Sequence, residues 1–333
     1  MSITIKRIKK IIVLFAALAL MSAAVLPAAA IGETVYAGGN AFGIKFFTKG
    51  ALVVGISAVE TVSGLASPSK EAGIRSGDLI TAVDGDEVLS GDEFLRIVSE
   101  SGGKAMKMTV MRGETTFETT VKPVSDAQSG AYRLGMYIRD SAAGIGTVTY
   151  VLSDGRFAGL GHGICDSETG TLLPLAEGAV VDVEITGVVK GKRNMPGELK
   201  GTFGSVRKGT LFSNTETGVY GGYYRFPKAL TEPTVTAHAK EGRAQILTTL
   251  GRDGIKSYDI EIESVDGSQS TKNLMIKVVD KELIERAGGI VQGMSGSPIM
   301  QDGKLVGAVT HVLVGDPTRG YGIFIENMLD AAE

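Results

Sequence analysis

The chain begins with a basic segment followed by a long apolar run. The run extends from Ile11 to Leu26 and is preceded by four basic side chains, those of Lys6, Arg7, Lys9 and Lys10. Pro27 and three alanines follow it and offer a small-residue cleavage site. The run approaches the roughly 20 residues that span a bilayer. We therefore expect residues 1–31 to be either a cleaved signal peptide or an uncleaved membrane anchor.

Short alternating segments and one helical pattern follow the apolar run. Strand-like apolar composition occurs in residues 42–46, 51–56, 106–111 and 116–121. Helical spacing of apolar residues occurs in residues 92–101. These segments predict a small domain that combines several strands with one longer helix.

Turn residues between these segments narrow the kind of fold that the small domain can have. Ala72 and Ile74 can pack a short helix, Gly77 turns the chain, and Asp84-Gly85 has the composition of a hairpin turn. In this order the segments strongly resemble a bacterial PDZ domain. We assign residues 32–124 to it.

The PDZ resemblance implies a peptide-binding groove. In PDZ domains an extended peptide adds as a strand beside the long helix, and a glycine-containing loop holds its terminal carboxylate. The resemblance places that loop near residues 39–44, with Gly43 and Ile44 as binding residues. It makes Phe94 and Val98 candidate walls of the groove, although both side chains fit ordinary core positions equally well.

Strand-like runs separated by glycines make up the rest of the chain. Residues 125–130 are small and polar, as in a linker, and separate these runs from the PDZ-like part. The expected strands lie at 147–151, 179–185, 255–262, 274–279 and 305–314. We therefore predict a mainly β fold with an α+β PDZ domain, and a β-barrel or sandwich in residues 125–333.

The composition excludes several classes of function. With 333 residues, of which 43% are hydrophobic, the chain can bury a sizeable core in more than one domain. The 34 basic and 37 acidic residues form no basic block, so we expect no nucleic-acid partner. Cys165 is the single cysteine, and no zinc or nucleotide motif occurs. The sequence predicts no metal and no cofactor.

The segment from Gly293 to Pro298 suits a catalytic serine. A hydroxyl becomes a useful nucleophile when a base takes its proton and N–H donors stabilise the oxyanion. The glycines allow a tight turn in which the N–H groups of Gly293 and Ser295 point beside the Ser295 hydroxyl. The segment resembles the Gly-Asp-Ser-Gly-Gly-Pro box of chymotrypsin-like peptidases. Met294 replaces the acid of that box, so we expect no activation by a new N-terminus.

Three histidines are candidates for the base. His162 lies in a glycine-flanked turn that can expose an imidazole, and we select it. His238 and His311 fit ordinary structural positions better, since His311 lies within an apolar strand.

Asp280 is the preferred acid because it ends a predicted strand fifteen residues before Ser295. Asp166 is its chief rival, but it lies so close to His162 in sequence that it fits the role of bracing that loop better. With Asp280, the chain order is His, Asp, Ser, as in chymotrypsin-like enzymes.

Four glycine-rich motifs together resemble the stage IV sporulation protein B peptidase family. They lie at residues 141–147, 161–166, 289–298 and 307–312. With the N-terminal segment and the PDZ domain, the resemblance covers nearly the whole chain. It agrees with a triad of His162, Asp280 and Ser295 and with a chymotrypsin-like double β-barrel.

The family resemblance also implies a biological role. Such peptidases act in endospore formation, are exported to the space between the forespore and mother-cell membranes, and cleave themselves. They cut a membrane-bound regulator that restrains sigma-factor processing. The expected partners are that regulator, the protein itself and a PDZ peptide ligand. The alternative is a noncatalytic PDZ scaffold whose peptidase domain is degenerate.

Overall fold

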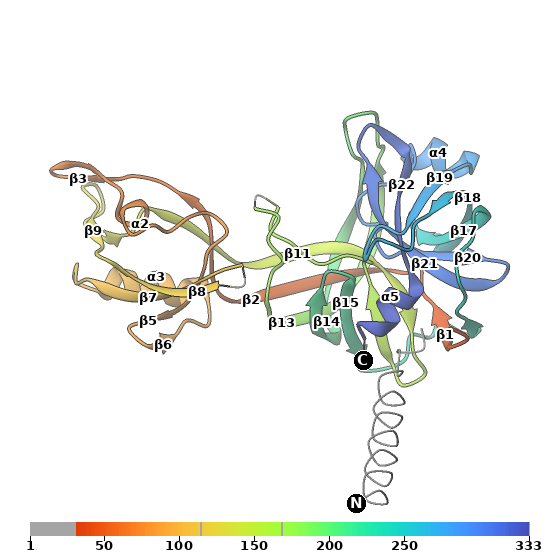
Figure 1. The fold of residues 1–333 in the computed structure, drawn as a ribbon, viewed down its shortest axis with the longest axis horizontal. Coiled ribbons are helices and arrows are strands. Elements are labelled where there is room, and N and C mark those ends of the chain that lie inside the picture. The colour runs from red at the N-terminus through yellow and green to blue at the C-terminus, as the bar shows by residue number, and fades with distance from the viewer. Residues whose placement is uncertain (1–30, 114, 168, 333) are drawn as a thin grey trace, which may run out of the picture.

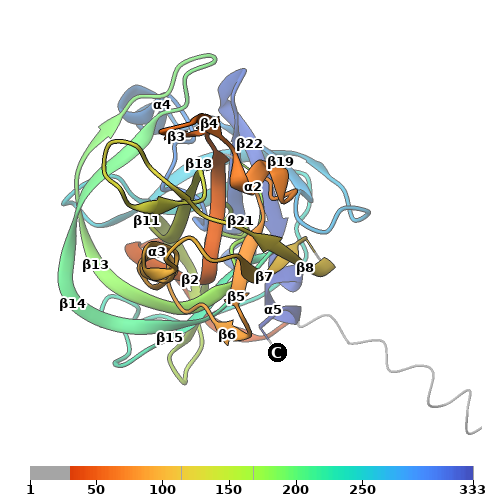
Figure 2. The ribbon, with the colours of Figure 1, turned by 90° about the vertical axis from the view of Figure 1, so that its left-hand side faces the viewer.

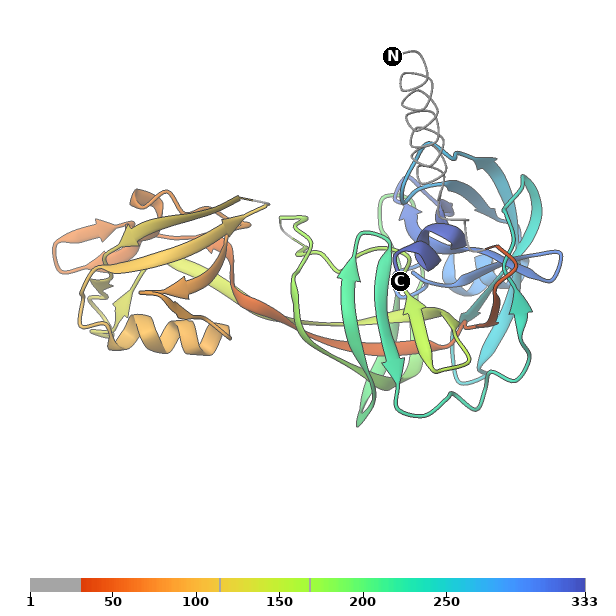
Figure 3. The same cartoon turned by 60° about the horizontal axis from the view of Figure 1, so that its bottom comes forward.

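The computed structural model describes residues 31–113, 115–167 and 169–332. The described chain forms two lobes, and two long strands run from one lobe to the other (Figure 1). These strands are β2 (Ala41–Ile56) and β11 (Met136–Val151), which pair antiparallel over most of their length. Figure 3 shows this two-stranded ribbon between the lobes from another side. The small lobe therefore grows out of strands that also belong to the large lobe.

Six strands of the large lobe close into a first barrel. β2 and β11 are joined there by β12 (Arg156–Gly159), β13 (Leu175–Val189), β14 (Glu198–Thr215) and β15 (Gly218–Tyr223). The ring closes because β11 pairs with β12 on one side and with β2 on the other. Phe42, Ile44 and Phe46 alternate along β2 and are buried in this barrel.

A second closed barrel contains six strands from the C-terminal part of the chain. They are β17 (Gly242–Thr249), β18 (Ile255–Val265), β19 (Leu274–Val278), β20 (Pro298–Gln301), β21 (Lys304–Leu313) and β22 (Asp316–Phe324). Alternate residues of β18, namely Tyr258, Ile260 and Ile262, are buried in it. Each such side chain contributes about 1.5–3 kcal/mol by leaving water. The two barrels confirm the predicted double β-barrel.

Short elements complete the large lobe. The helix α4 (Lys281–Ala287) follows β19, and α5 (Ile325–Asp330) follows β22. β1 (Thr34–Ala37) pairs with β11 and with β16 (Thr234–Val235), so the N-terminal end of the described chain is fixed in the sheet.

The small lobe has the expected α+β composition, and Figure 2 looks directly onto it. Its elements are β3 (Val59–Thr61), β4 (Gly64–Ala66), α2 (Pro68–Glu71), β5 (Leu79–Val83), β6 (Asp86–Glu87), α3 (Gly91–Glu100), β7 (Met106–Arg112), β8 (Thr115–Val121), β9 (Val124–Ser125) and β10 (Tyr132–Arg133). Ser90 caps α3 by accepting a hydrogen bond from the Glu93 N–H at 3.2 Å. Phe94 and Val98 form the apolar face of this helix.

The sheet pairing places the start of the small lobe later than residue 32. Residues 42–48 of β2 pair with β13, and β1 pairs with β11 and β16, so both segments belong to the large lobe. The small lobe begins only where Ala51 pairs with β5. It is therefore an insertion within the peptidase lobe rather than a domain that precedes it, because β2 and β11 each contribute to both sheets.

Residues 1–30, which contain most of the predicted signal peptide or anchor, lie outside the described residues. Among the residues that are described, no helix combines the length and apolar character needed to cross a membrane.

Candidate active site

A cleft of about 740 Å³ lies between the two barrels. Its walls come from β2 and β11 of the first barrel, the loop after β12, the segment before β20, and the end of β21. His162, Ser295 and His311 all line it. The structure thus brings the predicted nucleophile and base into one cavity, although they are far apart in sequence.

The turn that carries Ser295 is held from both barrels. The Thr147 N–H donates to the Ser295 carbonyl at 2.9 Å, and the Thr147 hydroxyl donates to the Gly293 carbonyl at 2.8 Å. The Gly296 N–H donates to the Val309 carbonyl at 2.7 Å. Gly296 has a φ of 93°, and a Cβ there would strike the backbone of Thr147. Only glycine fits this close approach between β11 and the turn.

Two N–H groups of this turn have no partner among the described residues. The N–H groups of Met294, Gly296 and Ser297 each donate to a backbone carbonyl. Within the part of the chain that the structure describes, those of Gly293 and Ser295 donate to nothing. Unpaired donors beside a serine hydroxyl are what an oxyanion hole requires. The turn therefore has the donors that the sequence predicts.

His162 follows β12 in a tight loop that enters the cleft. Its Nδ1 lies 2.8 Å from the Gly163 carbonyl oxygen, which assigns the proton to Nδ1 and leaves a lone pair on Nε2. Burial lowers the pKa of His162, and the bond to Gly163 opposes that shift. The ring is therefore held in the neutral form that a general base requires.

The Ser295 hydroxyl is not hydrogen-bonded to His162 in this structure. It donates instead to the Thr310 carbonyl oxygen at 2.7 Å. Loose contacts between nucleophile and base are common in serine enzymes without substrate.

His311 is the functional candidate that the sequence analysis set aside. It lies on β21 at the rim of the cleft, where its ring centroid is 4.7 Å from that of His162, at an interplanar angle of 36°. Burial, the charge of His162 and the charge of Lys272 lower the pKa of His311 to about 4. In the sequence, the signal for His311 was its position next to Thr310, in the predicted strand that follows the nucleophile segment.

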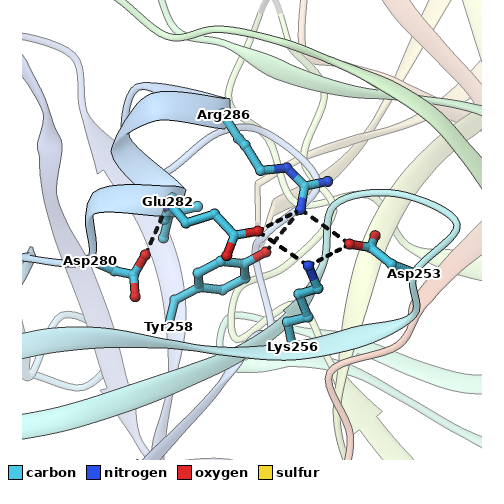
Figure 4. Close-up of polar contacts among 7 residues, drawn as sticks. Asp253, Lys256, Tyr258, Asp280, Glu282 and Arg286 are labelled. Atoms are coloured by element: carbon cyan, nitrogen blue, oxygen red, sulfur yellow. Dashed lines mark hydrogen bonds and ion pairs between the residues drawn. The ribbon is translucent and has the colours of Figure 1, made fainter.

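Asp280 does not contact His162, and its predicted role as the triad acid is not supported by this geometry. It is the N-cap of α4, where one oxygen accepts from the Leu283 N–H at 2.9 Å and the other from the Asp259 N–H at 3.3 Å. Figure 4 shows Asp280 at the start of α4, beside an ion-pair cluster. In that cluster Glu282 and Arg286 of the helix interact at 3.0 Å.

Asp166, the rival acid, braces the loop after His162. Its buried carboxylate pairs with Arg139 at 2.8 Å and accepts from the Thr169 N–H at 2.9 Å. His238 pairs with Glu326. Across the described ranges, no carboxylate is hydrogen-bonded to His162.

Cys165 also lines the cleft, near Gly163. Burial and the nearby Glu216 raise the pKa of its thiol. This shift disfavours a thiolate nucleophile, in line with the choice of Ser295.

The predicted peptide-binding residues of the small lobe need correction. Gly43 and Ile44 lie in the first barrel, where Gly43 packs against Phe203 and Ile44 is buried. Phe94 and Val98 are 1% and 4% exposed, so they are core residues. They cannot wall an open groove.

The small lobe has another edge for strand addition. Residues 136–139 of β11 pair with β2 on one side only, and α3 lies near their other side, where the Gly91 N–H donates to Asp140 at 2.6 Å. The preceding loop contains Gly135 in a left-handed conformation with a φ of 69°. A glycine loop followed by an open strand edge beside a helix has the features expected of a PDZ groove. The segment Leu134-Gly135-Met136 was the signal in the sequence.

Comparisons with known proteins cover both lobes. A family model described as SpoIVB peptidase S55 matches residues 130–329, and a PDZ domain model matches residues 61–112. The putative serine protease HhoA of Synechocystis sp. is 39% identical over 71 residues, which are 21% of this chain and 18% of that protein. A putative zinc metalloprotease of Clostridium perfringens is 30% identical over 70 residues, or 21% of each chain. The chain spans about a fifth of the length of these curated relatives.

Two solved structures are similar to parts of this chain. The Rv3671c protease from M. tuberculosis in its active form has 16% identity and a TM-score of 0.36, covering 57% of this chain and 72% of that one. The PDZ domain of an SdrC-like protein from Listeria monocytogenes has 22% identity and a TM-score of 0.23, covering 27% and 87%. The S55 model matches more than half of this chain, including both His162 and Ser295. The chain belongs to the SpoIVB peptidase S55 family of serine peptidases and carries a PDZ domain.

Proposed function

We propose that the protein is a serine endopeptidase in which Ser295 attacks the peptide carbonyl and His162 takes its proton. The N–H groups of Gly293 and Ser295 then stabilise the oxyanion. The observation that carries this proposal is the pair of unpaired N–H groups in the Ser295 turn, in the cleft that also holds His162. The N–H groups of Met294, Gly296 and Ser297 are instead hydrogen-bonded to backbone carbonyls and hold the turn in place.

The steps of the reaction follow from these positions. The Ser295 hydroxyl leaves its hydrogen bond to the Thr310 carbonyl and donates instead to Nε2 of His162. Nε2 accepts the hydroxyl proton as the new C–O bond forms. His162 returns that proton to the leaving amine as the peptide bond breaks and an acyl-enzyme remains. Water then releases the acyl group by the same route. The Gly163 carbonyl orients His162 by accepting a hydrogen bond from its Nδ1–H group.

We propose that the substrate is a membrane-bound regulatory protein and that its cleavage triggers sigma-factor processing during sporulation. We also propose self-cleavage, and export across or attachment to the cytoplasmic membrane through the N-terminal segment. Membership of the SpoIVB peptidase family supports these assignments. A protease with a PDZ domain takes protein substrates or peptide ligands, and the open edge of β11 suits an extended peptide.

The alternative function is a noncatalytic PDZ scaffold with a degenerate peptidase lobe. Two observations favour it. The Ser295 hydroxyl is hydrogen-bonded to the Thr310 carbonyl, and no described carboxylate is hydrogen-bonded to His162. A noncatalytic scaffold needs no reactive serine.

A fluorophosphonate probe, which labels activated serines, tests the proposed function on the purified full chain. We expect labelling at Ser295 in the wild type, and a loss of at least about 10⁴-fold in labelling rate in Ser295→Ala and His162→Ala. Mass spectrometry of the labelled peptide identifies the site. Absence of labelling in the wild type, or equal labelling of His162→Ala, supports the scaffold instead.

A further inference from the structure

His311 places an imidazole ring against the ring of the proposed base. The two ring centroids are 4.7 Å apart, and the planes are tilted by 36°. His311 comes from β21, whereas His162 comes from the loop after β12 in the other barrel. The contact therefore joins the two barrels within the cleft.

The position of His162 requires such support. The loop that carries it contains Leu160 and Gly161, both in the left-handed region with a φ of 68°. One hydrogen bond, between Nδ1 and the adjacent Gly163 carbonyl, is the polar contact that the described residues make with the ring. A single bond to the next residue fixes the tautomer but leaves the ring free to rock about that bond. A flat neighbour restricts this motion.

We propose that His311 is a positioning residue whose ring packs on His162 and fixes the plane in which Nε2 meets the Ser295 hydroxyl. This role rests on the proposed function of His162 and Ser295. In triad enzymes a carboxylate orients the base. Here the Gly163 carbonyl fixes the proton, and the flat contact from β21 fixes the plane.

The strand that carries His311 also contacts the nucleophile. The Thr310 carbonyl accepts the Ser295 hydroxyl at 2.7 Å, and His311 is the next residue. β21 is itself held by β22, where His311 lies opposite Tyr321. One strand thus contacts both reacting side chains.

The charge state of His311 suits this role. Its pKa is lowered to about 4, so the ring stays neutral while His162 takes up a proton. A neutral ring adds no repulsion to the imidazolium. The other ionisable groups around the pair are Lys272, Tyr321, Cys165, Glu216, and the Asp166–Arg139 ion pair.

Three variants at this position separate ring packing from other roles. His311→Phe keeps a flat ring, His311→Leu keeps apolar bulk without a flat ring, and His311→Ala removes both. His238→Gln is the matched control, because His238 pairs with Glu326 and does not line the cleft. The readout is inactivation of the purified full chain by a fluorophosphonate, analysed as a limiting rate and a half-saturating probe concentration.

We expect His311→Ala and His311→Leu to lower the limiting rate by about 10²-fold, since a small misplacement of a catalytic group costs that much. The half-saturating concentration should change by less than about 3-fold, because ground-state binding is untouched. His311→Phe and His238→Gln should stay within about 3-fold of the wild type. In His311→Ala the His162 ring becomes more exposed to solvent, so the pKa of His162 rises. The acidic limb of the pH profile of the limiting rate therefore moves to higher pH.

Two results would overturn the role of His311. One is a wild-type limiting rate in His311→Ala, and the other is an equal loss in His311→Phe and His311→Ala. Circular dichroism melting identifies variants that do not fold, and His311→Leu then replaces His311→Ala. Failure of the proposed function is separate, since the wild type itself would not be labelled at Ser295.

Discussion

The turn at Ser295 and the corner at Asp280 are fifteen residues apart on the second barrel, and they use their polar groups in opposite ways. At Asp280, both carboxylate oxygens accept backbone N–H groups and start a helix. At Ser295, two N–H groups have no partner among the described residues. The difference teaches that fully used polar groups hold the fold, whereas unused donors in a cleft mark a place for a ligand.

Within this comparison of the two regions, the largest expected effect comes from loosening the Ser295 turn. In Thr147→Val the Gly293 carbonyl loses its side-chain partner, which should cost about 1–3 kcal/mol of unfolding free energy. The labelling rate by a fluorophosphonate should fall by about 10-fold, because the Gly293 N–H shifts with the carbonyl. Thr147→Ser keeps the hydroxyl and should behave as the wild type. Equal rates in Thr147→Val and the wild type would show that this bond does not shape the oxyanion hole.

The second prediction tests Asp280 directly. Asn and Asp are equally good N-caps, whereas Ala loses about 1 kcal/mol. If Asp280 is only a cap, Asp280→Ala should lower the unfolding free energy by about that amount, and Asp280→Asn should be close to the wild type. Both variants should keep their labelling rates at Ser295. Urea unfolding and labelling measure the two effects.

A triad acid behaves differently in the same pair of variants. There, Asp→Asn preserves the geometry but lowers the rate by about 10⁴-fold. A loss of that size in Asp280→Asn, with normal stability, would restore Asp280 as the acid. It would also mean that the chain rearranges between this structure and the active enzyme.

The third prediction concerns the pH dependence of stability, which His311 alters only below its ordinary pKa. The folded pKa of His311 is about 4 against an ordinary value of 6.5. In the window between them, the unfolded chain binds a proton that the folded protein does not, so this group lowers stability as the pH falls. Urea unfolding at several pH values should show a shallower decline in His311→Phe than in the wild type. An identical decline would show that His311 titrates normally.

The local chemistry of the site was largely predictable from the sequence. Ser295 and His162 lie in glycine-rich segments whose backbone conformations need glycine, and these motifs are local. Asp280 was chosen as the acid because it ends a predicted strand, and that role stays a prediction, since in this structure Asp280 is the N-cap of α4. The competing signal was also local: Asp280 precedes a helical segment that ends at Gly288, in the left-handed conformation that closes helices.

Non-local pairing was not predictable in the same way. β2 spans sixteen residues, but nothing in its sequence indicates that residues 42–48 pair with β13 and Ala51 with β5. Gly43 and Ile44 were assigned to the small lobe for this reason. His311 was set aside likewise, because the contact between its ring and His162 depends on how two barrels meet.

The ribbon of β2 and β11 has a topological consequence. The small lobe is tethered by two chain crossings, so a single nick in either strand leaves it attached. Trimming from the N-terminus to remove it would also take away β1 and the part of β2 that pairs with β13. To remove the small lobe, the chain must be cut in both β2 and β11 and residue 48 connected to residue 141. The two strands are adjacent there, because Ser141 lies opposite Phe47.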